Sequence, residues 1–284
     1  MLRGIDVSRW QGQIDFNAVK RSGIEFVIIQ AGYGKSVTQK DTYFEQNYIR
    51  AKAAGLKVGA YWFSYAKTPE EAKQEAQTCA EVIKGKQFDF PIYYDLENDI
   101  KSCYFPFNTG KANCSAMVNA FCTELEKLGY FAGLYISRSP LQTHITKEVA
   151  QRFALWIAEY GTRLNYNGQY GIWQNSATGR IVGVIGYVDL DIAEIDYSSI
   201  IIKGGFNGYP KQKEEKPKEE KPKETKPSPA PKEPEYIDYV IQKGDTLTHI
   251  AKAFGTTIAK LKEINKIKNV NLIYAGDVIK IPKK

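Results

Sequence analysis

The sequence has few of the residues that bind transition metals. It contains two histidines, His144 and His249, and no pair of cysteines has the CxxC spacing of a zinc site. We therefore predict no metal site and no cofactor. The cysteines are interpreted as free thiols of a protein made in the cytoplasm, with a disulfide between the second and third as an alternative. They are Cys79, Cys103, Cys114 and Cys122.

Long hydrophobic runs are also missing. No run approaches the roughly 20 apolar residues that cross a bilayer. The first ten residues, MLRGIDVSRW, lack the apolar core of a secretory signal peptide. We therefore expect a protein that is made in the cytoplasm and does not insert into membranes. If it acts outside the cell, a separate route must release it.

One segment has almost no hydrophobic residues. Residues 210–235 contain eight Lys, seven Glu and seven Pro, and Ala230 is the sole apolar residue apart from the prolines. Such a composition cannot offset the entropy lost in ordering a packed structure. We interpret residues 210–235 as an extended linker between a domain at 1–209 and a small domain at 236–284.

The net charge of +7 is unevenly distributed over these parts. Residues 236–284 have nine Lys against four acidic residues, which leaves only +1 for each of the other two parts. A basic domain favours an anionic partner. Because it lacks a helix-turn-helix signature and the aromatic and basic pattern of a single-strand groove, we predict no nucleic-acid partner. An anionic cell wall is compatible with this charge.

Residues 1–209 alternate between strand-like and helical segments. Helical spacing occurs at 41–55, 68–85 and 113–129, and each of these segments ends in the glycine expected at a helix C-terminus. Several strand-like runs are almost entirely apolar, which is typical of parallel sheets. We predict an α/β fold, an irregular TIM-like β/α barrel. The eight predicted strands are 4–8, 26–33, 57–65, 90–97, 130–137, 153–160, 170–176 and 187–195.

Several of these strands end in acids or amides, and the carboxyl ends of the strands are where barrel enzymes carry their active sites. Residues two apart on a strand face the same side, so Asp95 and Glu97 are expected in one cavity. Asp189 and Asp191 are expected to share it too. The strand-end residues are Asp6, Gln30, Asp95, Glu97, Glu159, Gln174, Asp189 and Asp191.

A cluster of carboxylates suits the cleavage of glycosidic bonds. Like charges and burial raise the pKa of some members, so a protonated acid can lie beside an ionised one. Aromatic side chains near the strands suit the apolar faces of sugar rings. They are Tyr61, Trp62, Tyr93, Tyr94, Tyr135 and Trp173. The alternatives are solvated strand ends, a Ca²⁺ or Mg²⁺ site, and aromatic residues of the core.

Five motifs in order resemble the lysozymes of glycoside hydrolase family 25, the muramidases of phage endolysins and bacterial autolysins. They are GIDVSRWQGQIDF, GAYWFSY, YYDLEN, GIWQNS and GYVDLD, and the resemblance covers residues 2 to about 203. It implies an irregular β/α barrel. It also implies hydrolysis of the β-1,4 bond between N-acetylmuramic acid and N-acetylglucosamine.

The resemblance assigns roles by position. Glu97 matches the general acid, Asp95 the partner carboxylate that orients the 2-acetamido group, and Asp6 and Asp189 the flanking acids. The usual VDLN reads VDLD here, so Asp191 competes with Asp189. A covalent and a substrate-assisted mechanism both remain open. We expect substrate contacts from Gln30, Tyr61, Trp62, Tyr135, Trp173 and Asp191.

Residues 239–282 closely resemble a LysM module. They begin YVIQKGDTLTHIAKAFG and end NLIYAGDVIKIP, which indicates a small α+β domain of order βααβ. LysM modules bind glycans that contain N-acetylglucosamine. The resemblance places that site at Gly244, Asp245, Thr246, Leu247, Leu272, Ile273 and Tyr274.

Together these features predict a modular peptidoglycan hydrolase in which the barrel cuts and the LysM module holds the wall. We interpret it as a phage endolysin released through holin-type membrane holes, with an exported autolysin as an alternative. Two other functions were weighed. A chitinase-like barrel would carry the acid series D-x-x-D-x-D-x-E, whereas FPIYYDLE has Phe90 and Tyr93 at the two earlier acid positions. A catalytically inactive wall-binding protein would not need all four acids.

Overall fold

The computed structural model describes residues 1–211, 236–241, 245–267, 269–270, 273 and 277–282. The chain divides into two compact units, one that contains the described residues up to 211 and one that contains those from 236 onward. The predicted linker lies outside the described residues from 212 onward. Across the ranges that the structure describes, no helix is long and apolar enough to cross a membrane.

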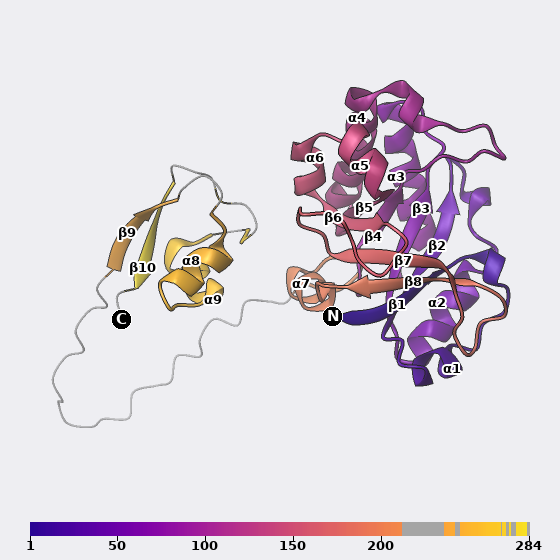
Figure 1. The fold of residues 1–284 in the computed structure, drawn as a ribbon, viewed down its shortest axis with the longest axis horizontal. Helices are drawn as coiled ribbons and strands as arrows, with labels where there is room; N and C mark the ends of the chain where they lie inside the picture. The colour runs from indigo at the N-terminus through magenta and orange to yellow at the C-terminus, as the bar shows by residue number, and fades with distance from the viewer. Residues whose placement is uncertain (212–235, 242–244, 268, 271–272, 274–276, 283–284) are drawn as a thin grey trace. The chain divides into compact units, whose positions relative to one another are not determined.

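The first unit is a closed barrel of eight strands in the order β1 to β8 (Figure 1). All neighbours from β1 to β7 pair in parallel, whereas β8 is antiparallel to both β7 and β1. The predicted irregular TIM-like barrel is confirmed. The strands are β1 (Leu2–Val7), β2 (Phe26–Tyr33), β3 (Lys57–Phe63), β4 (Ile92–Asp95), β5 (Ala132–Ser137), β6 (Ala154–Ala158), β7 (Ile172–Gly179) and β8 (Val188–Ala193).

The direction of β8 follows from its connection. Parallel neighbours need a crossover of about a dozen residues, usually with a helix, whereas an antiparallel pair needs only a hairpin. Residues 180–187 leave room only for such a hairpin between β7 and β8. The irregular part of the barrel is therefore its last third, where the sequence shows the weakest helical spacing.

Helices surround the barrel, and their ends carry the expected capping residues. Thr68 Oγ1 accepts the N–H of Glu71 at the start of α3, where Pro69 is the first helical residue. Gly55, Gly85 and Gly129 all have positive φ. The helices are α1 (Phe16–Arg21), α2 (Phe44–Ala53), α3 (Pro69–Ile83), α4 (Lys111–Lys127), α5 (Arg138–His144), α6 (Lys147–Arg152) and α7 (Tyr197–Gly204).

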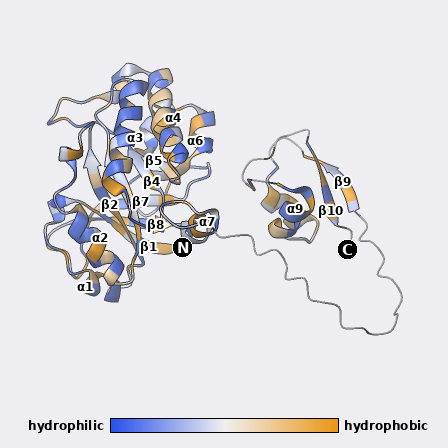
Figure 2. Ribbon diagram, turned by 180° about the vertical axis from the view of Figure 1, so that it is seen from behind, coloured by the Kyte–Doolittle hydropathy of each residue, from blue (hydrophilic) through white to orange (hydrophobic). Residues whose placement is uncertain are grey.

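The barrel strands are buried on both faces. Their outward side chains pack under the helices. Figure 2 shows hydrophilic residues along the outer helix α3 and hydrophobic ones in β1. Inside the barrel, Phe26 stacks on Phe90 with ring centroids 4.5 Å apart, and Tyr197 of α7 contacts Phe90 at 5.9 Å. These residues lie where strands begin, so α7 closes that end. The polar interior positions are at the opposite end.

Gly4 makes room for the Phe26 ring. A Cβ at Gly4 would lie 2.2 Å from the ring tip. We expect Gly4→Ala to lower the free energy of unfolding of the barrel by about 1–3 kcal/mol through overpacking, measured by chemical denaturation. Phe26→Leu removes the clashing atoms, so the double variant should lose less than the two single losses combined. Additive losses would contradict this account.

The second unit has the predicted order β9 (Tyr236–Val240), α8 (Leu247–Ala253), α9 (Ile258–Asn265) and β10 (Val278–Pro282). β9 and β10 pair antiparallel. Asn265 ties α9 to β10, because its side chain bonds both the N–H and the C=O of Lys280. The small core consists of Ile241, Leu247, Ile250, Ala251, Leu261, Ile279 and Ile281.

Candidate active site

The strand-end acids converge inside the barrel. The aromatic interior residues Phe26 and Tyr93 mark the inward face of their strands, and Asp6 and Asp95 occupy inward positions near the carboxyl ends of β1 and β4. Glu97 follows β4 by two residues. On β8, Asp191 opposes Gly4 and Asp189 opposes Asp6 across the antiparallel ladder. Five carboxylates from three strands therefore meet at one end.

Asp6 and Asp191 form the deeper pair. Gln174 Nε2 donates to Asp6 Oδ2 at 2.7 Å, and Trp156 Nε1 donates to Asp191 Oδ1 at 2.8 Å. Burial and the adjacent Asp191 raise the pKa of Asp6 well above its usual range, and burial does the same for Asp191. Asp191 Oδ2 is buried and has no hydrogen-bond partner among the described residues. Burial and the mutual repulsion of the two carboxyls therefore favour the protonated form of each over its charged form.

Asp95, Glu97 and Asp189 form the shallower group. Burial and the charge of Glu97 raise the pKa of Asp95 well above its usual range, and its Oδ1 is buried without a partner among the described residues. Burial first, and then the charge of Asp189, raise the pKa of Glu97 to about 7. Burial raises the pKa of Asp189 to about 6. Glu97 is thus an acid that still holds its proton in part of the population at neutral pH.

Asp189 and Asp191 lie at different depths. Both side chains face the interior, but Asp191 is 2% exposed and lies beside Asp6 under the indole of Trp156. Asp189 is half-buried, and its charge acts on Glu97. The structure therefore brings Asp189 toward Glu97 and Asp191 toward Asp6.

The aromatic candidates divide by strand face. Tyr61 and Tyr135 point inward. Burial raises the pKa of Tyr61, and the charges of Asp6 and Asp95 raise it further. Tyr135 Oη donates a hydrogen bond to Gln174 Oε1. Gln30 is buried beside Tyr61, its register partner on β3. Trp62 faces the opposite way.

Two of the predicted substrate contacts need correction. Trp62 is fully buried between the sheet and the helices, and its Nε1 donates to the C=O of Gly34. Trp173 alternates with the inward Gln174 on β7, and its Nε1 donates to the C=O of Glu159. Both indoles therefore lie outside the barrel. Tyr94 also points outward, where it stacks on Phe121.

The sequence did not indicate Trp156 and Tyr160 as residues near the acids, and it wrongly suggested that Glu159 joins them. Trp156 holds Asp191, and its inward position on β6 was the available signal. Tyr160 is 60% exposed beside the acids, and burial with the charges of Asp189 and Glu97 raises its pKa to about 12. Glu159 is not part of the cluster, because it pairs with Arg138 at 2.8 Å.

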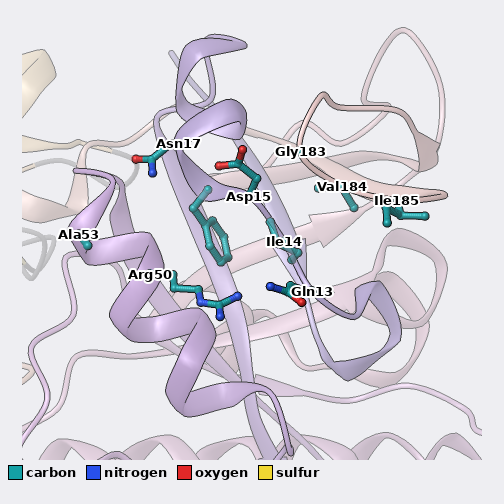
Figure 3. Close-up of a pocket in the computed structure, with 10 residues that line it drawn as sticks. Gln13, Ile14, Asp15, Asn17, Arg50, Ala53, Gly183, Val184 and Ile185 are labelled. Atoms are coloured by element: carbon teal, nitrogen blue, oxygen red, sulfur yellow. The ribbon is translucent and has the colours of Figure 1, made fainter.

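The structure also contains a pocket of about 690 Å³ that is separate from the acids (Figure 3). None of the five carboxylates lines it. Among the described residues, no group of three or more His, Cys, Asp or Glu side chains could hold a metal ion, and all four cysteines are free. The pocket is lined by Gln13, Ile14, Asp15, Phe16, Asn17, Arg50, Ala53, Gly183, Val184 and Ile185.

The candidate glycan residues of the second unit are described in part. Asp245 accepts a hydrogen bond from Tyr239 Oη at 2.8 Å, and Thr246 is half-buried. Leu247 is a core residue with 2% exposure, so its side chain is removed from the candidate contacts. Ile273 is partly buried against the same core. Gly244, Leu272 and Tyr274 lie outside the described residues.

Buried carboxylates gathered at the carboxyl ends of barrel strands define this unit as an enzyme-type β/α barrel with acid–base chemistry. Residues 5–184 match the model of glycosyl hydrolases family 25, and the chain belongs to this family. Residues 239–282 match the model of the LysM domain. The resemblance drawn from the motifs is therefore confirmed. The family match ends before β8, so Asp189 and Asp191 are placed by the structure alone.

Known proteins with similar sequences include lysozymes. The autolytic lysozyme of Clostridium acetobutylicum is 32% identical over 205 residues, which are 72% of this chain and 58% of that protein. Lysozyme M1 of Streptomyces globisporus is 29% identical over 202 residues, 66% of each chain. The crystal structure of the CTP1L endolysin is 28% identical with a TM-score of 0.61, over 72% of this chain and 70% of that one. The matched part thus spans less than two thirds of the Clostridium lysozyme.

Proposed function

We propose that this protein is an N-acetylmuramidase that hydrolyses the β-1,4 bond between N-acetylmuramic acid and N-acetylglucosamine in peptidoglycan. The observation that carries the proposal is the Glu97 carboxyl, with a pKa of about 7, facing the more acidic Asp189 at the end of the barrel. A general acid with a pKa near the working pH beside a carboxylate is the pair that glycoside hydrolysis requires. Family membership and the two lysozyme relatives support the same substrate.

In the proposed mechanism, Glu97 gives its proton to the glycosidic oxygen as the C1–O bond breaks. The positive charge that develops at C1 is stabilised by the ionised carboxylate of Asp189. The unpartnered Asp95 Oδ1 is suited to accept the N–H of the 2-acetamido group, which aims the acetamido oxygen at C1. Water then attacks C1 and returns a proton to Glu97, so the enzyme is regenerated.

The Asp6–Asp191 pair supports this site from below. Burial and mutual repulsion disfavour two negative charges on these acids. Gln174 and Trp156 fix the orientation of the pair through hydrogen bonds to separate carboxyls. We infer that the pair forms a fixed polar floor of the site, while burial and the charges of Asp189 and Asp99 raise the pKa of Glu97.

The second unit is proposed to hold the enzyme on the wall by binding N-acetylglucosamine-containing glycan. The LysM match and the excess of Lys over acids in residues 236–284 support this role. We further propose that the protein is a phage endolysin that reaches the wall after release from the cytoplasm through holin-type membrane holes. The similarity to the CTP1L endolysin supports the endolysin part of this proposal. Digestion of purified peptidoglycan, with the products analysed by mass spectrometry, tests the proposal. Reducing-end muramic acid is expected, and reducing-end glucosamine or released peptides would overturn it.

The pH dependence of hydrolysis should show the pKa values of the two facing acids. Above about pH 7, Glu97 loses the proton that it must donate, so kcat/KM should fall about tenfold per pH unit. Below about pH 6, protonation of Asp189 removes a stabilising charge. We expect a bell-shaped profile on soluble glycan chains. Asp189→Asn removes a charge that raises the Glu97 pKa, so its alkaline limb should move to lower pH. An unmoved limb would contradict the facing arrangement.

A further inference from the structure

Trp10 is an exposed aromatic residue on a tightly fixed turn. Its side chain is 75% exposed, although it follows Asp6 by only four residues. It lies in the 3-10 turn η1 (Arg9–Gln11), where Ser8 Oγ accepts the Trp10 N–H and Gln11 Oε1 accepts the Ser8 N–H. The Arg9 N–H donates to Asp41 Oδ2 at 3.0 Å. The indole contributes little to the core, yet its backbone is held in place, as in a preformed binding surface.

Two cations flank this indole. The Arg9 guanidinium lies 4.9 Å from the centroid of the Trp10 ring and 5.7 Å from that of Tyr33. The Lys101 ammonium lies 5.9 Å from the Trp10 ring. Within the described ranges, neither cation has an acidic partner within 4 Å. The charge of Arg9 also acts on the Asp41 carboxylate, which it does not contact in an ion pair. Two cations over an aromatic face are suited to an anionic ligand that also has an apolar ring.

The loop that carries Lys101 is also anchored. Asp99 and Tyr104 exchange two backbone hydrogen bonds of 2.9 Å, which close the loop directly after Glu97. The Asp99 carboxylate accepts the N–H of Lys101 at 3.0 Å and the hydroxyl of Tyr65 at 2.7 Å. The Asp99 carboxylate forms no ion pair with the Lys101 ammonium among the described residues. The anchored loop thus brings the Lys101 cation to Trp10.

We propose that Arg9, Trp10 and Lys101 form a substrate subsite that stacks on a sugar ring and binds the carboxylates of the peptide stem attached to muramic acid. The inference rests on the proposed muramidase function and adds a preference for stem-bearing glycan. The turn and the loop follow Asp6 and Glu97 in the chain, so the cations lie on the rim of a site that is itself acidic. Unpaired cations there offset the repulsion between the acid cluster and an anionic substrate.

The test compares kcat/KM of the full chain on two substrates, peptidoglycan glycan chains with their stems and the same chains after an amidase has removed them. Both are first stripped of anionic wall polymers. The wild type should prefer the stem-bearing chains by about tenfold, because each exposed charge pair contributes a factor of up to about five. Arg9→Gln with Lys101→Gln should abolish the preference, and Trp10→Ala should weaken hydrolysis of both substrates. The preference should decline as salt increases.

The control variant, Lys20→Gln with Lys84→Gln, removes two exposed lysines that form no ion pair within the described residues, and it should keep the preference. Thermal melts confirm folding, and Lys101→Gln alone provides a milder test. Equal preference in the double cation variant and the control would overturn the subsite. A preference that is present on unstripped walls, measured in parallel, but absent on the stripped chains would assign the cations to those polymers instead. A wild type that releases no reducing ends from either substrate would overturn the muramidase function itself.

Discussion

Glu97→Gln should lower kcat on peptidoglycan by at least about 10²-fold, because the amide cannot donate the proton that the leaving oxygen needs. The effect should be confined to catalysis. Glu97 forms no ion pair within the described residues, and the glutamine is nearly isosteric. The measurement is the release of reducing ends from purified peptidoglycan, with wall binding measured in parallel. Binding should be unchanged.

Glu81→Gln is a suitable control for this substitution. Glu81 is exposed on α3 and has no ion pair within the described ranges, so the same change of charge there should leave turnover intact. Near-normal turnover of Glu97→Gln would refute its role as the general acid. Asp95 would then be the next candidate, because burial and the charge of Glu97 raise its pKa as well.

Removal of the LysM unit should weaken retention on cell walls by about 10²-fold or more, since a tethered second binding site increases the effective concentration of the first. The structure indicates where to cut. Asn207 donates to the C=O of Phe90 at 2.8 Å, and Tyr209 Oη donates to Asp89 at 2.6 Å, so these residues belong to the barrel. A chain that ends after Lys211 preserves both contacts and should remain folded.

Retention is best measured in the Glu97→Gln background, so that the wall is not digested during the assay. Hydrolysis of short soluble glycan chains by the otherwise wild-type truncation should stay near normal, because the acids all lie in the first unit. Equal retention of the truncated and full chains would contradict the anchoring role. Loss of hydrolysis of the soluble chains would show instead that the barrel depends on the second unit.

Placing the acids at two depths gives them different tasks. The deeper pair accepts hydrogen bonds from donors on β6 and β7, so its side chains are held in fixed orientations. The shallower group has fewer fixed partners, and Glu97 there has the pKa of a working acid. Burial contributes most to each shift, and the neighbouring carboxylates add to it. The same residue type therefore serves in two roles because its surroundings differ.

The sequence by itself determined the local structure and the chemical content of the site. Runs of apolar residues bounded by polar segments located all eight strands, and capping residues such as Thr68 located helix ends. The acids at the ends of β1, β4 and β8 indicated a glycosidase, and the motifs indicated its family. These properties depend on neighbours in the chain, which the sequence contains in full.

Only the tertiary structure decided which way the side chains face. Barrel strands are buried on both faces, so an apolar residue on either face looks the same in the sequence. Trp62 and Trp173 therefore appeared as suitable as Tyr61 and Tyr135, although the indoles lie outside the barrel. The antiparallel β8 sets the depths of Asp189 and Asp191 through its register with β1. That register depends on pairing between the first and the last strand of the barrel, and no local sequence pattern specifies it.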